Sequence, residues 1–202
     1  MEPSAALAFV RSEPDIAPNQ KEPEILWLLE LLAAERPKVV LEVGTDRGGT
    51  LFLWSMVAAS EAVLISVDIQ KMVGRLGSLS PFALVRKSFR RGGQRVELVD
   101  DADSQSPETL ARVRAMLGGR LVDFLFLDGD HRYEAVRRDF ELYAPLVRPG
   151  GLVAFHDVSP NTTADTVGTA AFWAGLKEGN ETDELIADGA AGYGIGVYRK
   201  PR

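Results

Sequence analysis

The sequence contains two histidines, and both stand beside aspartates. The segment LDGDH contains Asp128, Asp130 and His131, and the segment FHD contains His156 and Asp157. Clustered carboxylates repel one another unless a proton or a cation lies between them. Their oxygens suit magnesium or manganese, and a neutral imidazole is a suitable base near pH 7. If the fold brings the two segments together, they predict a metal site, a proton-transfer site or both.

Within this cluster, Asp128 and Asp157 are predicted to hold a divalent cation, and His131 is placed to take a proton from a substrate hydroxyl. A structural alternative is that Asp130 caps the helix expected near Tyr133, while His131 merely packs beside it. Capping and catalysis are compatible, so this alternative weakens only the catalytic role of Asp130.

A glycine-rich turn, EVGTDRGGT, begins at Glu42. Gly44 can take positive φ, and Gly48 and Gly49 would let a helix start close under a ligand. A dinucleotide fingerprint needs glycine where this chain has Asp46, whose side chain and charge oppose a pyrophosphate. The acids at positions 42 and 46 suit a sulfonium and an α-amino group instead. The turn therefore favours S-adenosylmethionine (SAM) over NAD, with a plain strand-to-helix turn as the structural alternative.

Two further strand ends carry groups that a nucleoside could bind. Asp68 ends the segment VLISVD, where an acid can accept both ribose hydroxyls of an adenosine. This feature does not separate NAD from SAM, and a solvated strand-end aspartate is its structural alternative. Asp103 and Ser104 could meet the adenine amino group, or this stretch could simply open the next helix, for which Ser106 is a good N-cap.

Alternating strand and helix patterns must position these groups. Buried strands are predicted at residues 38–43, 63–67, 96–99, 122–127 and 152–155, and two closing antiparallel strands at 184–187 and 193–198. Helices are predicted at 23–36, 50–59 and 166–177, and a further one begins near Tyr133 and ends before Pro145. Continuous apolar strands separated by helices indicate a parallel sheet covered on both faces. The carboxyl ends of parallel strands share one edge, so the glycine turn and the acidic cluster should open on one cleft. The predicted fold is a doubly wound α/β sandwich.

Composition narrows the class of protein. The chain has 202 residues, 46% hydrophobic and 26% charged, which is typical of one globular domain. The absence of cysteine excludes disulfides, thiolate zinc sites, iron–sulfur clusters and a cysteine nucleophile. A net charge of −6 argues against nucleic acid or an anionic membrane as partner. We recognise no secretory signal and no membrane span, and therefore expect a cytoplasmic protein.

Several segments are predicted to lie around the site. Prolines at 3, 14, 18 and 23 predict that residues 1–20 form an extended arm ahead of a domain at 21–202. This arm, residues 70–94 and residues 159–173 are expected to build the acceptor pocket. The basic run RKSFRR, which starts at Arg86, is expected to be a solvated helix or a grip for an acidic acceptor. The apolar helix at 23–36 could serve as an interface in a homo-oligomer.

Together these motifs resemble the class I SAM-dependent methyltransferases. The resemblance is closest to a bacterial family with a DGDH-Y-E signature and a terminal HD pair, related to the macrocin O-methyltransferase and the cephalosporin hydroxylase group. The matching segments are LEVGTDRGGTLFLW, LISVDI, FLDGDHRYEAVRRD, PGGLVAFHDV and GYGIGV. The resemblance covers the chain from about residue 21 onward. It implies a Rossmann-like, seven-stranded, mostly parallel sheet with an antiparallel last strand.

The resemblance also implies roles for single residues. The predicted cofactor-binding set is Glu42, Gly44, Thr45, Gly48, Gly49, Asp68, Ile69, Asp103, Ser104 and Asp128. By position, the magnesium ligands of catechol-type O-methyltransferases map to Asp128 and to the pair His156 and Asp157, and their lysine base maps to His131. The aspartate base of macrolide- and aminocoumarin-type relatives maps to Asp130. The chain departs from both patterns at His156, because imidazole is a poor magnesium ligand. Either His156 does not contact the metal, or the metal is softer, such as manganese or zinc.

The predicted function is methyl transfer from SAM to a hydroxyl oxygen of a small molecule or sugar, such as a natural product. A divalent metal, magnesium or manganese, is expected to assist at Asp128, Asp157 and His156. The first alternative is a SAM-binding protein without turnover, since fold does not determine function. The second is an NAD(P)-dependent oxidoreductase.

Overall fold

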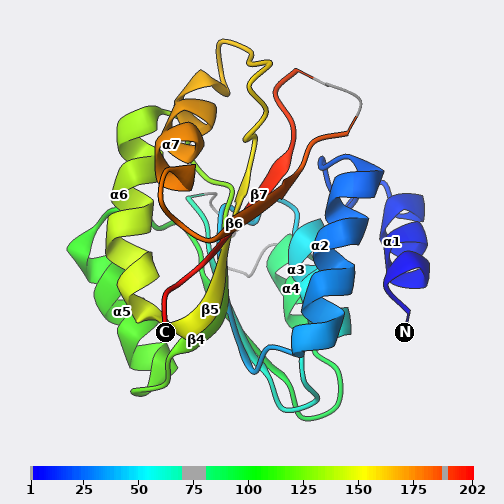
Figure 1. The fold of residues 1–202 in the computed structure, drawn as a ribbon. Helices are drawn as coiled ribbons and strands as arrows, with labels where there is room; N and C mark the ends of the chain where they lie inside the picture. Colours follow the sequence, from blue (N-terminus) through cyan, green and yellow to red (C-terminus); the bar gives the residue numbers. More distant parts are fainter. Residues whose placement is uncertain (1, 70–80, 188–190) are drawn as a thin grey trace.

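The computed structural model describes residues 2–69, 81–187 and 191–202. In this part of the chain, seven strands form one sheet with helices on both faces (Figure 1). The strands are β1 (Val39–Val43), β2 (Val63–Val67), β3 (Arg95–Val99), β4 (Val122–Leu127), β5 (Val147–His156), β6 (Thr182–Leu185) and β7 (Ile195–Arg199). Their order is β3-β2-β1-β4-β5-β7-β6. Strands β1 to β5 pair in parallel, and β7 is antiparallel to both of its neighbours, which confirms the predicted fold class.

The helices form two layers (Figure 1). One layer contains α1 (Pro3–Ser12), α2 (Glu22–Glu35), α3 (Gly49–Val57) and α4 (Pro81–Ser88), and the other contains α5 (Pro107–Leu117), α6 (Tyr133–Tyr143), the short 3₁₀ helix η1 (Ala144–Leu146) and α7 (Val167–Lys177). Successive side chains of a strand point to opposite faces of the sheet. Val40 therefore packs in the core under α1–α3, and Leu41 packs in the core under α5–α7. Strands β1 and β2 are buried at every residue because both faces of the sheet are covered.

The first residues correct one expectation. Residues 3–12 form helix α1 instead of an extended arm, and Ala6, Leu7 and Val10 are buried in the core that α1 shares with α2 and α3. Pro3 fits the first turn of this helix, where a missing N–H costs nothing. The prolines suggested an extended chain, but the helical spacing of these apolar residues lets them pack together on one face of α1. The division of the chain at residue 20 remains a prediction.

The basic run also differs from its expectation. Arg86 is completely buried, and its Nη2 lies 2.8 Å from Asp100 Oδ1. A buried guanidinium requires such a partner, because burying an unpaired charge is costly. Lys87 and Arg90 are exposed, so only part of the run is solvated. Residues 70–80 of the predicted acceptor segment lie outside the described residues.

Within the described ranges, none of the helices combines the length and the apolar character needed to cross a bilayer.

Candidate active site

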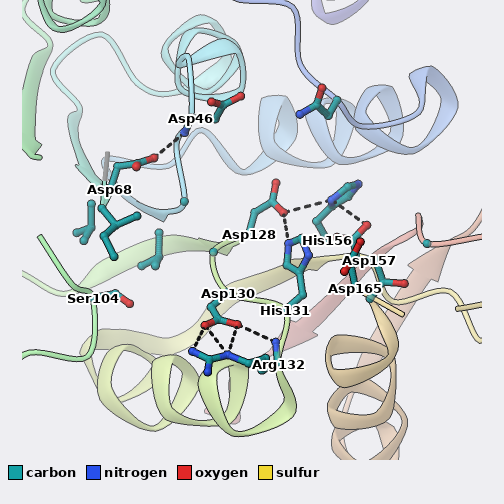
Figure 2. Close-up of a pocket in the computed structure, with 18 of the residues that line it drawn as sticks. Asp46, Asp68, Ser104, Asp128, Asp130, His131, Arg132, His156, Asp157 and Asp165 are labelled. Atoms are coloured by element: carbon teal, nitrogen blue, oxygen red, sulfur yellow. Dashed lines mark hydrogen bonds and ion pairs between the residues drawn. The ribbon is translucent and has the colours of Figure 1, made fainter. Parts of the chain in front are cut away.

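A cavity of about 820 Å³ opens at the carboxyl edge of the sheet (Figure 2). Ten of the residues predicted from sequence line it: Gly44, Asp68, Ile69, Asp103, Ser104, Asp128, Asp130, His131, His156 and Asp157. The described lining does not include Glu42, Thr45, Gly48 or Gly49. The fold therefore brings the nucleoside-type residues and the acidic cluster to one cavity, as parallel strands require.

The glycine turn and the end of β4 touch at Gly44. Gly44 has φ of +86°, and its N–H donates to Val67 O at 2.9 Å. A Cβ on Gly44 would lie 2.0 Å from the backbone oxygen of Asp128, closer than any side chain can approach. Glycine is therefore required here both by conformation and by space.

Asp68 holds the glycine turn in place. Its Oδ2 accepts the backbone N–H groups of Thr45 at 2.8 Å and Asp46 at 2.6 Å. Asp46 has φ of +47°, an uncommon value for a residue with a side chain. Asp68 thus holds the turn from the end of β2. The predicted contact with a ribose would be a second role of the same carboxylate.

Glu42 lies beneath the turn instead of on the cavity surface. Its carboxyl group is fully buried, and Trp54 Nε1 donates to its Oε1 at 2.8 Å. Burial raises the pKa of Glu42 to about 7, although hydrogen bonds from Thr50, Trp54 and Thr45 oppose the shift. A direct contact with a sulfonium or amino group, as the sequence predicted, would need a path through the turn.

The glycines that precede and begin α3 make room for protein atoms. A Cβ on Gly48 would lie 2.6 Å from Cγ of Arg86, and one on Gly49 would lie 2.1 Å from the backbone oxygen of Ile16. The sequence predicted a ligand close to these glycines. The structure places Arg86 and the segment between α1 and α2 there, and Thr45 instead contacts Ser66, with 2.7 Å between their hydroxyl oxygens.

The stretch after β3 both opens helix α5 and lines the cavity. Ser106 caps α5 by accepting Glu108 N–H at 3.2 Å, which confirms the N-cap. Ser104 faces the cavity and donates to Asp139 Oδ1 at 2.8 Å. Burial raises the pKa of Asp139 to about 6. Sequence reasoning missed this residue, although an acid on the apolar face of a helix was a usable signal.

The ends of β4 and β5 bring two carboxylates and two imidazoles together (Figure 2). Nδ1 of His156 lies 3.2 Å from Oδ1 of Asp128 and 3.2 Å from Oδ1 of Asp157. Nε2 of His131 lies 3.3 Å from Oδ2 of Asp157 and 3.7 Å from Oδ1 of Asp128. Asp157 takes φ of +63°, an uncommon conformation that places it beside the histidines.

The pKa of each group in this cluster depends on the charges of its neighbours. Burial alone would lower the pKa of His156, but the carboxylates of Asp128 and Asp157 outweigh it and raise that pKa to about 10. The hydrogen bond with Asp128 raises the pKa of His131 against its burial. For Asp128, burial opposes ionisation, yet the two imidazoles lower its pKa overall. Ionised carboxylates only accept hydrogen bonds. Nδ1 of His156 must therefore carry a proton, which Asp128 and Asp157 share as acceptors.

A cation could replace these protons. The ligand atoms of Asp128, His131 and Asp157 all lie within 4.8 Å of one another. Two carboxylates and one imidazole form a donor set that suits manganese well and magnesium through its oxygens. The third member of this candidate set is His131, whereas the sequence had predicted His156 in that place.

Asp130 turns away from this cluster (Figure 2). Its carboxylate forms several bonds with the guanidinium of Arg132 and accepts Arg132 N–H at 2.9 Å. These hydrogen bonds lower the pKa of Asp130, which makes its carboxylate a weaker base. The N-cap position of α6 is Arg132 itself, so Asp130 stabilises the start of the helix from two residues earlier.

His131 is held by the start of α7. A Cβ on Gly168 would lie 2.3 Å from the backbone oxygen of His131, so α7 abuts this turn directly. Thr169 Oγ1 donates to the same oxygen at 3.5 Å. The imidazole keeps 32% side-chain exposure toward the cavity, against 6% for His156. His131 is therefore the imidazole that a ligand in the cavity can reach.

Five further lining residues come from the segments predicted to build the acceptor pocket, residues 1–20 and 159–173, and a sixth comes from the GYGIGV segment. They are Asn19, Gln20, Thr163, Asp165, Thr166 and Tyr193. Gln20 Nε2 donates to Asp128 Oδ2 at 2.6 Å, and Lys21 Nζ lies 4.2 Å from the ring centre of Tyr193. The sequence predicted these segments but not the individual residues, because single polar residues in loops carry no periodic signal.

Residues 41–158, more than half of the chain, match a family described as a methyltransferase domain. The chain belongs to this methyltransferase family. A curated relative, an uncharacterized protein of Acanthamoeba polyphaga mimivirus, is 30% identical over 124 residues, which cover 58% of this chain and 50% of that protein. The matched part thus spans about half the length of the viral protein.

Solved structures share the fold of this methyltransferase. An O-methyltransferase from Bacillus cereus in complex with S-adenosylhomocysteine (SAH) has a TM-score of 0.65 and 16% identity, covering 99% of this chain and 91% of that one. The MycE methyltransferase from the mycinamycin biosynthetic pathway, in complex with Mg and SAH, has a TM-score of 0.64 and 16% identity, covering 98% of this chain and 55% of that one. At such identities the likeness concerns the fold.

Proposed function

We propose that this methyltransferase moves the methyl group of SAM to a hydroxyl oxygen of a small molecule or sugar, with a divalent cation at Asp128 and Asp157. We assign this activity to residues 21–202. The observation that carries the proposal is the pairing, in one cavity, of the Asp68 turn with two carboxylates and two imidazoles. The SAH in the Bacillus cereus enzyme and the Mg and SAH in MycE support it by analogy of fold.

The donor is proposed to bind along the ends of β1, β2 and β3. Asp68 and Ile69 would contact the ribose and one face of the adenine, and Asp103 and Ser104 would meet its amino group. Asp46 lines the same cavity, and its charge would repel the pyrophosphate of a dinucleotide. The same charge favours the cationic sulfonium and α-amino group of SAM over NAD(P).

The acceptor hydroxyl is proposed to lie beside the cluster at the ends of β4 and β5. A cation bound by Asp128 and Asp157 would lower the pKa of that hydroxyl and orient its oxygen. His131 takes the hydroxyl proton, because its imidazole faces the cavity whereas Asp130 is engaged by Arg132. His156 keeps the two carboxylates together through its shared Nδ1 proton. The methyl group is already electrophilic on the sulfonium, so alignment and deprotonation are the remaining tasks of the chain.

The remaining cavity wall favours a hydroxylated acceptor. Thr163, Asp165, Thr166 and Tyr193 line the side beyond the cluster, and each carries a hydroxyl or carboxyl group. Such groups bind sugar or phenol hydroxyls through directed hydrogen bonds. A glycosylated or phenolic natural product is the acceptor class that we propose.

The test combines binding and turnover in the full chain. Calorimetry should detect SAH binding and no NAD binding, and a panel of sugars and phenols with methyl-deuterated SAM should yield an O-methylated product by mass spectrometry. Turnover should fall in chelator and return with Mg²⁺ or Mn²⁺. Binding of SAH without transfer to any acceptor would favour a SAM-binding protein, and binding of NAD alone would favour an oxidoreductase. Full turnover in chelator would exclude the metal.

A further inference from the structure

Gln20 reaches the cluster from outside the matched methyltransferase segment. It lies between α1 and α2, ahead of residues 41–158, and only 4% of it is exposed. Its side chain lines the cavity, and its Nε2 lies 2.6 Å from Oδ2 of Asp128. An ionised carboxylate only accepts hydrogen bonds, so the amide group of Gln20 must present its NH₂ to Asp128.

The contacts of Asp128 divide its two oxygens between different partners. Oδ1 faces both imidazoles, at 3.2 Å from His156 Nδ1 and 3.7 Å from His131 Nε2. Oδ2 accepts the bond from Gln20. A carboxylate held at one oxygen cannot rotate freely, so Oδ1 stays directed at the histidines.

The backbone around Gln20 is anchored on both sides. Arg11 Nη2 donates to the carbonyl oxygen of Gln20 at 2.7 Å, and Lys21 lies over the ring of Tyr193. The carbonyl oxygen of Ile16 packs against Gly49, where a Cβ would collide with it. The position of the amide is therefore set by α1, the glycine turn and the loop before β7 together.

One feature of Gln20 argues against a purely structural role. Its Oε1 is buried and has no hydrogen-bond partner among the described residues. An acceptor left unsatisfied in the interior costs stability, and an apolar side chain of similar shape would avoid that cost. Such a cost is typical of residues whose contribution is to function.

We propose that Gln20 is a positioning residue: it holds the carboxylate of Asp128 so that Oδ1 alone serves the histidines, the cation and the acceptor hydroxyl. This inference rests on the proposed function, since it deepens the description of the same site. It makes the segment between α1 and α2 part of the active site. Partners that orient a ligand carboxylate typically affect metal affinity or activity 10- to 100-fold when removed, on the order of magnitude seen in other metal sites.

The test uses Gln20→Met in the full chain, because methionine keeps the shape and loses both the donor and the unsatisfied oxygen. Ser12→Ala is the matched control in α1, since Ser12 is exposed and its hydroxyl donates to Phe9 O in its own helix. We expect Gln20→Met to lower kcat and Mn²⁺ affinity by roughly 10- to 100-fold, with SAH affinity within about twofold. The melting temperature should stay within about 2 °C of wild type or rise. Ser12→Ala should match wild type in all four measurements.

A second variant and a second readout keep the test decisive. Gln20→Glu retains the shape but replaces the donor with a charge, and it should lose turnover at least as strongly. The chain has two histidines, so NMR of labelled imidazoles gives one set of signals for each. Without any metal, both sets should shift in Gln20→Met and neither in Ser12→Ala, because both imidazoles contact Asp128.

Unchanged turnover, Mn²⁺ affinity and imidazole signals in both Gln20 variants would overturn the inference. A lowered melting temperature with a parallel loss of SAH affinity would also overturn it, since that pattern is expected of a residue that only stabilises the fold. Absence of SAH binding and of methyl transfer in the wild type would instead refute the proposed function. The imidazole signals still test the contact in that case.

Discussion

The two ends of the cavity are built by different means. At the end where we propose that the cofactor binds, Asp68 accepts two backbone N–H groups of the glycine turn, so backbone geometry defines the surface. At the other end, the carboxylates and imidazoles contributed by β4 and β5 hold one another, and their balance of charge defines the surface. The first arrangement depends on the hydrogen bonds that one carboxylate accepts from the backbone. The second depends on every proton or cation that enters it.

A residue with positive φ occurs at each end of the cavity. Asp46 after β1 and Asp157 after β5 have φ of +47° and +63°, respectively. At Asp46 the unusual conformation aims a backbone N–H at Asp68, whereas at Asp157 it aims a side chain at the histidines. Strained conformations of this kind persist where the surrounding contacts over-determine them, which is typical of functional sites.

The largest expected effect comes from Gly44→Ala, which would break both ends at once. Its Cβ would lie 2.0 Å from Asp128 O, and its φ of +86° disfavours alanine. We expect a loss of about 3–5 kcal/mol in the free energy of unfolding, measured by urea denaturation. Gly118→Ala is the control, because Gly118 has φ of +57° but open space around its Cβ position. Its cost should be about 1 kcal/mol, and equal costs for the two variants would contradict the close contact.

Asp128→Asn should disable the charge-dependent end alone. It removes the carboxylate that both imidazoles face, and the expected loss in kcat is on the order of 10²- to 10⁴-fold. SAH affinity, measured by calorimetry, should stay within about threefold, since the glycine turn is untouched. Asp130→Asn should cost much less, because Asp130 is bound to Arg132. Equal losses in the two variants would restore Asp130 as a candidate base.

His131→Gln separates proton transfer from metal binding at the same end. If His131 is the base, kcat should fall about 100-fold or more while Mn²⁺ affinity, measured by electron paramagnetic resonance, changes little. His131 also completes the set of ligand atoms that lie within 4.8 Å of one another. A parallel loss of Mn²⁺ affinity would therefore show that it is a ligand.

Asp68→Asn should affect the backbone-defined end alone. An amide oxygen accepts the Thr45 and Asp46 N–H groups more weakly than a carboxylate does. We expect SAH affinity to fall about 10- to 100-fold by calorimetry, with kcat at saturating SAM reduced only a few-fold. Glu42→Gln should change SAH affinity less, since Glu42 lies beneath the turn. The reverse order would give Glu42 the cofactor contact that its sequence position predicted.

The smallest effect concerns Asp139, which lies between the two ends beside Ser104. Its pKa is raised from 3.8 to about 6, so ionisation costs stability as pH rises through this window and the cost is fully present above it. Asp139→Asn should therefore stabilise the protein by about 1–2 kcal/mol at pH 8, with little gain at pH 4. Urea midpoints at both pH values measure this. The exposed Glu141→Gln should show no such pH dependence, and a stabilisation of Asp139→Asn at pH 4 as large as at pH 8 would contradict the assignment.

Much of the fold could be predicted because it depends on periodicity. The strands predicted at 63–67 and 122–127 are observed with identical bounds, as β2 and β4, and the others differ at their ends. The N-terminal helix was missed because prolines outweighed the spacing of Ala6, Leu7 and Val10. Element ends depend on capping and on tertiary contacts, which patterns along the chain do not specify.

The sequence alone determined which residues meet at the edge of the sheet. Buried parallel strands must deliver their carboxyl ends to one side, so the aspartates and histidines that follow β4 and β5 had to share the cavity with the turn after β1. This reasoning needs only the apolar runs and their order. The physical cause is the parallel sheet, which two-sided burial imposes.

Only the tertiary structure decided what each of these groups touches. Arg132 captures Asp130, Trp54 binds Glu42 under the turn, and Gln20 reaches Asp128 from 108 residues away. Such pairings depend on backbone direction and burial to within an ångström, because hydrogen bonds weaken steeply with distance and angle. Residue types alone indicated which functional groups lie at the carboxyl edge of the sheet. Which partner each group contacts follows from the tertiary geometry.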